Sequence, residues 1–109
     1  MRATLIEVID RLDEVDGSDR FTPPCIYAEG GPHARCDAPS LVCPTDEEGS
    51  FECPQDSTLS YVLMVQQAQA CIRVWSAWRG GRRPTRQDKF AGVMYYSQHD
   101  AWLPMEERG

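Results

Sequence analysis

A proline- and glycine-rich segment between residues 17 and 56 places the strongest constraint on the fold of this chain. Most of the prolines and half of the eight glycines lie in this segment. Proline lacks a backbone N–H and fixes φ, so turns are expected here in place of helix. Two short apolar runs, "CIYA" at 25–28 and "SLVC" at 40–43, predict strands. The residues between and after these runs predict two loops, "EGGPHARCDAP" and the acidic "PTDEEGSFECPQD".

Helical periodicity precedes this segment. Apolar side chains recur at positions 5, 8, 9, 12 and 15, and this spacing predicts a helix over residues 5–16 with one buried face. Thr4 followed three residues later by Glu7 predicts a capping box at the start of this helix. Gly17 is expected to end the helix.

The second half of the chain predicts one strand and two helices. Alternating apolar residues predict a strand over 59–65, and helical spacing then predicts a helix over 66–79, ended by two glycines. Thr85, with Asp88 three residues on, predicts the start of a helix over 86–98. The inward stripe of this last helix is expected to hold Phe90, Val93, Met94 and Ser97. We therefore expect a single α+β domain over residues 1–109, with about three helices packed on a small, mainly antiparallel sheet.

Charge is unevenly distributed along the chain, whose net charge is −6. Residues 1–60 hold thirteen acids and four arginines, a net charge of −9, whereas residues 61–109 hold four acids and seven bases, a net charge of +3. The acidic half argues against nucleic acid as the main ligand, because phosphate neutralisation drives such binding. It suits a basic protein partner, or else serves as a solvated, solubilising face.

No membrane or export signal is recognisable in the sequence. No apolar run approaches the roughly 20 residues that span a bilayer. The N-terminal "MRATLIEVIDRLDEVD" has acids where a signal peptide has its apolar core. We expect a cytoplasmic protein without membrane contact.

Five cysteines allow two structural interpretations. His33, Cys36, Cys43 and Cys53 have the ligand types of a zinc site, but only "HARC" has the short spacing of a zinc knuckle. An odd number of cysteines and the lack of a secretion signal argue against a disulfide framework. We expect Cys43 and Cys71 to be small buried side chains and the loop cysteines to be incidental. A zinc-binding or regulatory module built on those four residues is the alternative.

The aromatic-rich stretch "YYSQHDAWL" at 95–103 is interpreted as the end of the last helix. His99 falls at the helix terminus, Asp100 is expected to turn the chain, and Trp102 and Leu103 return to the core. Nothing in this stretch places a nucleophile beside a base.

The upstream run "RGGRRPTR" either holds a phosphate at a helix N-terminus or is a solvated connection. We therefore expect no enzyme and no cofactor.

The C-terminal half resembles a family of small, uncharacterised bacterial domains of immunity-protein type. The resemblance runs from "LSYVLMVQQAQACI" to "FAGVMYYSQHDAWL", and the "LIEVIDRLD" start is similar to the family's opening helix. The matching positions are Tyr61, Leu63, Val65, Gln66, Gln69, Ile72, Tyr95, Tyr96, Asp100 and Ala101, with Trp102 where the family has phenylalanine. The segment 23–54 departs from the family pattern, which has a shorter acidic stretch there.

The resemblance implies an immunity protein, because many members of that family are encoded beside secreted antibacterial toxins. Such a protein binds its cognate toxin domain stoichiometrically and has no catalytic residues. Inhibitors of nucleic-acid-directed toxins commonly present acids to a basic active site. The residues expected to bind the toxin, named here the acidic set, are Glu29, Asp37, Asp46, Glu47, Glu48 and Glu52.

Overall fold

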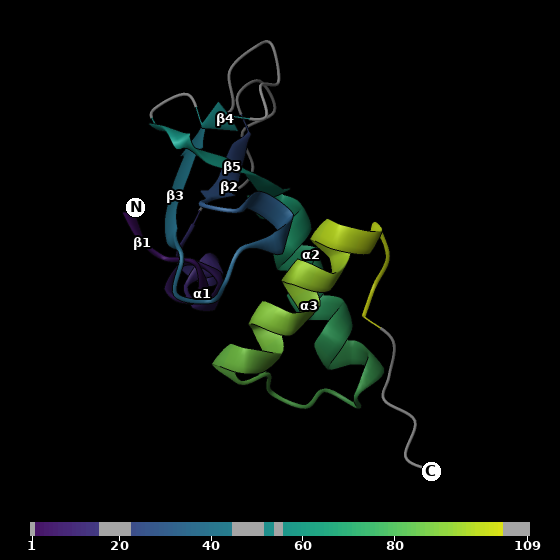
Figure 1. Cartoon of the computed structure of the whole chain (residues 1–109). Coiled ribbons are helices and arrows are strands. Elements are labelled where there is room, and N and C mark those ends of the chain that lie inside the picture. Colours follow the sequence, from purple (N-terminus) through teal and green to yellow (C-terminus); the bar gives the residue numbers. More distant parts are fainter. Residues whose placement is uncertain (1, 16–22, 45–51, 54–55, 104–109) are drawn as a thin grey trace.

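The structure, a computed structural model, describes residues 2–15, 23–44, 52–53 and 56–103. It shows three α-helices below a single antiparallel sheet (Figure 1). The strands are β1 Arg2–Thr4, β2 Pro24–Ala28, β3 Pro39–Pro44, β4 Glu52–Cys53 and β5 Asp56–Met64. The helices are α1 Leu5–Asp10, α2 Val65–Trp78 and α3 Arg86–His99, with short 3-10 helices η1 Leu12–Glu14 and η2 Gly31–His33. The predicted α+β class is confirmed, and so is the antiparallel sheet.

Strand β2 lies at the centre of a sheet with the order β1-β3-β2-β5-β4, and all four strand pairings are antiparallel. The strands predicted at 25–28 and 40–43 are confirmed as β2 and β3. A bulge interrupts the β2–β5 pairing, because Ile26 lies opposite Leu63 whereas Tyr27 lies opposite Tyr61. Val62 is the extra residue, and this is why Val62 and Leu63 both join the core between the sheet and the helices.

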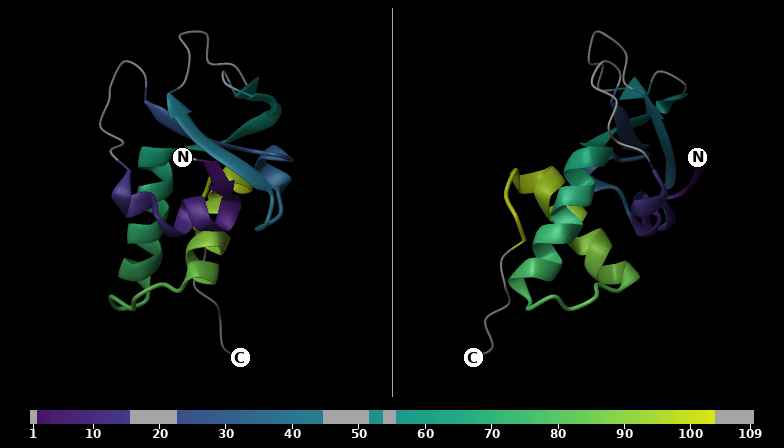
Figure 2. Two further views of the ribbon diagram at one scale, coloured as in Figure 1. Left: turned by 90° about the vertical axis from the view of Figure 1, so that its left-hand side faces the viewer. Right: turned by 180° about the vertical axis from the view of Figure 1, so that it is seen from behind.

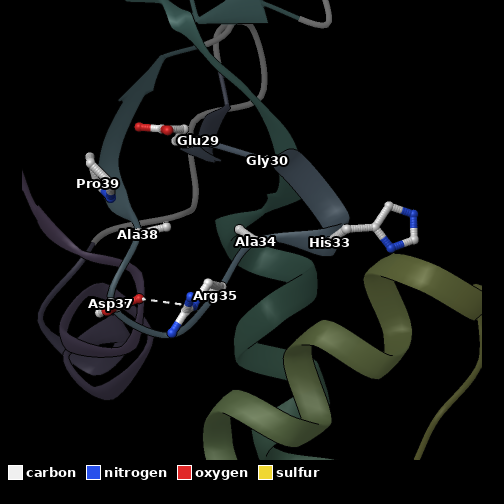
Figure 3. A pocket seen from close by; sticks show the side chains of 8 residues that line it. All are labelled: Glu29, Gly30, His33, Ala34, Arg35, Asp37, Ala38 and Pro39. Carbon is white, nitrogen blue, oxygen red and sulfur yellow. Dashed lines mark ion pairs between the residues drawn. The ribbon is translucent and has the colours of Figure 1, made fainter.

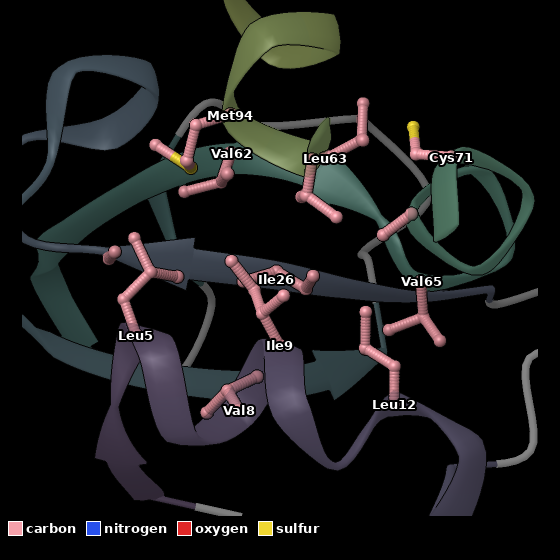
Figure 4. Packing of buried hydrophobic residues seen from close by; sticks show 13 residues of the cluster. Leu5, Val8, Ile9, Leu12, Ile26, Val62, Leu63, Val65, Cys71 and Met94 are labelled. Carbon is pink, nitrogen blue, oxygen red and sulfur yellow. The ribbon is translucent and has the colours of Figure 1, made fainter. Parts of the chain in front are cut away.

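The two faces of the sheet bury two separate cores. The larger core lies between the sheet and the helices (Figure 4). Figure 2 shows the sheet layer and the helix layer from two further directions. The smaller core lies on the opposite face and contains Cys25, Tyr27, Leu41, Cys43, Cys53 and Leu59. Period-two alternation explains this division, since neighbouring residues of a strand point to opposite faces. Cys25 and Tyr27 therefore belong to the smaller core, and Ile26 and Ala28 to the larger.

The N-terminal helix is shorter than the predicted 5–16. α1 ends at Asp10, and η1 continues the apolar stripe through Leu12, which is buried. The predicted capping box does not form: the Thr4 hydroxyl donates to the Glu7 carboxylate at 2.7 Å, with no side-chain bond to the helix backbone. Thr4 instead ends strand β1, and the amide of Leu5 donates to the Ala38 carbonyl at 2.9 Å. Pairing with the loop before β3 thus satisfies one of the backbone donors that the first turn of a helix leaves without an intrahelical partner.

The second-half predictions are confirmed within a few residues. Strand β5 begins at Asp56 and gives way to α2 at Val65, one residue before the predicted start. Gly80 and Gly81, with φ of 68° and 83°, follow the end of α2. The predicted cap of α3 is present, because the Thr85 hydroxyl accepts from the Asp88 amide and the Asp88 carboxylate accepts from the Thr85 amide.

The stretch 95–103 ends α3 largely as expected. Asp100 adopts a left-handed conformation with φ of 54°, and its amide donates to the Tyr96 carbonyl at 2.8 Å. The Trp102 ring then packs on Tyr96, with ring centroids 4.8 Å apart, and is partly buried. His99 is exposed and its ring contacts Tyr95. Of the helices in the described ranges, none has the length and apolar character needed to cross a bilayer.

Candidate functional site

The loop between β2 and β3, residues 29–38, surrounds an open depression of about 410 Å³ (Figure 3). Its polar lining comes from Glu29, His33, Arg35 and Asp37, and the rest of the lining is glycine, alanine and proline. Two members of the acidic set, Glu29 and Asp37, are therefore brought to the same surface feature. Figure 3 shows them at separate positions on the loop, with Ala38 between them.

Two glycines give this loop its conformation. Gly30 and Gly31 have φ values of 95° and 57°, a region that side-chain-bearing residues rarely adopt. A Cβ on Gly31 would also lie 3.3 Å from the Tyr61 carbonyl oxygen, and one on Gly30 would lie 3.2 Å from the Cα of Ala34. The "GG" of the sequence thus turns the chain sharply after β2 and lets η2 approach β5.

Hydrogen bonds anchor the loop to three parts of the fold. The Glu29 amide donates to the Pro39 carbonyl at 3.0 Å, where the hairpin begins. The Ile6 amide of α1 donates to the Cys36 carbonyl at 2.9 Å, and the Gln98 side-chain amide of α3 donates to the Pro32 carbonyl at 2.8 Å. These hydrogen bonds fix the loop backbone at both ends and in the middle, and this backbone carries the exposed side chains of the depression.

The depression carries mixed charge. Arg35 and Asp37 form an ion pair of 3.6 Å between Nε and Oδ1, with 87% and 71% of their side chains exposed. Exposed pairs of this kind contribute on the order of 0–1 kcal/mol. The pair is therefore readily exchanged for a contact with another molecule. Arg35 and His33 were not among the residues predicted to bind the toxin, although His33 was a predicted ligand of the zinc alternative. The signal for Arg35 was its position two residues before Asp37.

The other members of the acidic set are only partly placed. The backbone of Glu52 lies in β4 opposite Ser60, at the far edge of the sheet from β1. Asp46, Glu47 and Glu48 lie outside the described residues. The structure therefore brings Glu29 and Asp37 to one depression. That all six residues of the acidic set share one surface stays a prediction.

The four residues of the zinc alternative lie in two different environments. Cys43 and Cys53 are buried in the smaller core, whereas His33 is exposed on the loop and Cys36 is partly buried there. Within the described ranges, no group of three or more histidine, cysteine, aspartate or glutamate side chains is placed to hold a metal ion. The structure thus does not assemble the predicted ligands.

The cysteine predictions are confirmed for Cys43 and Cys71, which are both buried. Burial raises the pKa of the Cys71 thiol to about 12. The expectation that Cys53 is an incidental loop residue is wrong, because it lies in β4 and is only 3% exposed. Its apolar neighbours come from distant strands, so a local sequence pattern does not reveal them.

The arginine-rich run is organised around an aromatic ring at the far end of the helices. The guanidinium carbons of Arg79 and Arg82 lie 4.5 and 4.9 Å from the ring centroid of Trp75. These cation–π contacts fix two arginines of the connection between α2 and α3. Phosphate binding and a solvated connection both stay predictions for this run.

Searches for similar proteins return nothing for this chain: no protein-family model, no curated protein and no solved structure matches it.

Proposed function

We propose that this chain is a bacterial immunity protein, which neutralises a cognate antibacterial toxin domain by stoichiometric binding. The observation that supports the proposal best is the anchored β2–β3 loop, which presents the carboxylates of Glu29 and Asp37 around one open depression. Loops held on a rigid scaffold are typical recognition elements, because little ordering is required when they bind. The resemblance of the C-terminal half to immunity-type domains points to the same function.

The partner proposed for this surface is a toxin domain with a basic face. A net charge of −9 in residues 1–60 favours encounter with such a face. An arginine of the toxin would compete with Arg35 for Asp37, which is possible because both side chains of the Arg35–Asp37 pair are largely exposed. Recognition of this kind needs neither a metal nor a reactive side chain.

Co-expression tests the immunity function directly. The product of the adjacent open reading frame would be expressed in a bacterial host with and without this chain. We expect growth arrest without the chain, growth with it, and a one-to-one complex on copurification. A neighbouring product that is harmless, or that does not bind this chain, would refute the proposal.

Charge reversal tests the binding surface. Glu29→Lys with Asp37→Lys should slow association with the toxin by about tenfold at low salt, since reversed rim charges act mainly on the association rate. Asp13→Lys with Glu14→Lys is the matched control, because both are exposed acids and the double reversal changes the net charge by the same amount. It should change the rate by about twofold or less.

A second pair of reversals tests the rest of the acidic set. Glu47→Lys with Glu48→Lys should slow association in the same way if those residues contact the toxin. Association kinetics at two salt concentrations compare the two double variants. If neither alters the rate or the affinity, the acidic set is not the binding surface, even where co-expression shows protection.

A further inference from the structure

Cys43 and Cys53 make an unusual contact in the smaller core. Their sulfur atoms lie 3.3 Å apart, although β3 and β4 are separated in the sheet by β2 and β5. In a flat sheet, three strand spacings of about 4.8 Å would hold these strands about 14 Å apart. The sheet must therefore curl strongly enough to bring its third-neighbour strands together over the smaller core.

From this geometry we infer that Cys43 and Cys53 are a redox-active pair that forms a disulfide across the curled sheet. An S–S bond has a length of about 2.0 Å. The sulfurs would therefore need to approach by only about 1.3 Å. Both side chains are 3% exposed and already face one another, so the bond needs no new encounter between distant parts of the fold.

The reaction is a thiol–disulfide exchange with a small disulfide such as glutathione disulfide. One cysteine thiolate attacks a glutathione sulfur, which forms a mixed disulfide and releases one glutathione thiolate. The other cysteine thiolate then attacks the protein sulfur of the mixed disulfide and releases the second glutathione. Two electrons pass from the protein to glutathione disulfide, and the two thiol protons end on the two glutathione thiols.

The other three cysteines are less well placed to form a disulfide with Cys43 or Cys53. Cys25 lies directly opposite Cys43 in the β2–β3 register and belongs to the same core, so it is the competing partner. Its thiol, however, is directed to the Pro23 carbonyl at 3.6 Å. Cys36 lies on the β2–β3 loop and Cys71 lies on α2 in the larger core, so neither belongs to the smaller core in which the pair forms.

Burial governs the rate of this exchange in the folded protein. It raises the pKa of the Cys43 thiol to about 12, with the neighbouring Cys53 thiol acting in the same direction. The reactive thiolate of Cys43 is therefore scarce at neutral pH, and oxidation of the folded chain is expected to be slow. Oxidation during refolding avoids this barrier, because the thiols are then exposed.

The test is to refold the full chain from urea in a redox buffer of reduced glutathione and glutathione disulfide, in which the reduced form reverses mixed disulfides on single cysteines. We expect the five free thiols of the reduced chain to fall to three, and the mass to fall by two hydrogen atoms. Peptide mapping without reduction should link Cys43 to Cys53. The oxidised protein should melt on the order of 10 °C higher than the reduced protein, because the cross-link lowers the conformational entropy of the unfolded chain.

Alanine variants provide the matched controls. Cys43→Ala and Cys53→Ala should abolish the linkage and the rise in melting temperature, whereas Cys25→Ala and Cys71→Ala should retain both. Peptide mapping of the unmodified chain decides the matter should a variant fail to fold. A Cys25–Cys43 linkage, glutathione adducts without an internal bond, or five remaining thiols would each overturn the inference.

Discussion

At the residue scale, His99 and Trp102 are three residues apart but have different surroundings. Trp102 packs on Tyr96 at the edge of the larger core, whereas His99 is exposed at the end of α3. Full burial of a large aromatic would make its truncation cost about 3–5 kcal/mol. Because Trp102 is only partly buried, we expect Trp102→Ala to lower the free energy of unfolding by about 2 kcal/mol.

His99→Ala serves as the comparison for this prediction. Its contribution at a helix C-terminus is at most about 1 kcal/mol, and its loss should leave binding to the proposed toxin partner unchanged. Urea unfolding of both variants, with binding measured in parallel, gives the order of the two effects. A stable His99→Ala protein that had lost its function would instead indicate a direct functional role for the imidazole.

The sequence predicts whether a side chain is buried where the residue belongs to the apolar stripe of a regular helix or strand. Val93 and Met94 were expected on the inner face of α3, and both are buried. Cys53 could not be predicted, because its burial depends on the curl of a sheet whose strands are distant in sequence. The same holds for Arg35, whose approach to the depression depends on the turn at Gly30 and Gly31.

At the element scale, one glutamine joins η1 to α2. The Gln69 side-chain amide donates to the carbonyls of Leu12 and Val15, at 2.8 and 2.9 Å. The Leu12 carbonyl also accepts the Val15 amide of η1 at 3.1 Å, so Gln69 adds a second bond to this carbonyl and one to the next residue after the segment. Gln69→Ala should therefore lower the free energy of unfolding by about 1–2 kcal/mol, the loss of two part-buried hydrogen bonds.

Gln66→Ala is the control on the same helix. Gln66 is exposed, and its truncation should change stability by less than about 0.5 kcal/mol. Chemical denaturation measures both variants, and amide exchange at residues 12–15 would locate the effect of the first. Equal changes in the two variants would show that the bonds from Gln69 to η1 do not contribute measurably to stability.

Element boundaries were predicted well where local signals agree with packing. The Thr85 cap fixes the start of α3, and Gly80 and Gly81 mark the end of α2, so both could be read from the sequence. The first helix was overextended, because its apolar spacing continues through Leu12 while the backbone changes at Arg11 to a 3-10 turn. Strand β1 was missed, since three residues carry no periodic signal and pair with a distant strand.

At the scale of the whole molecule, one ion-pair cluster joins the N-terminal and C-terminal helices. Lys89 Nζ lies 3.2 Å from the Asp10 carboxylate and donates to the Asp10 carbonyl, and Arg86 Nε lies 3.5 Å from the same carboxylate. This cluster connects residues almost eighty positions apart, so it forms only when the complete fold assembles. The side chains of Asp10 and Lys89 are 30% and 22% exposed, which limits their pairing to about 1 kcal/mol.

The cluster predicts how the stability of the whole protein changes with pH. The hydrogen bond from Lys89 holds the pKa of Asp10 below its usual value of 3.8, against the opposing effect of burial. A carboxyl with a lowered folded-state pKa stabilises the protein above the unfolded-state pKa and loses this contribution as pH falls through the folded-state value.

Asp10→Asn should therefore be less stable than the wild type at pH 7, and the difference should shrink below about pH 4. Urea unfolding between pH 7 and 3 measures this, with Asp13→Asn, an exposed acid of η1, expected to follow the wild type throughout. A constant difference between Asp10→Asn and the wild type across this range would show that Asp10 contributes through packing and not through its charge.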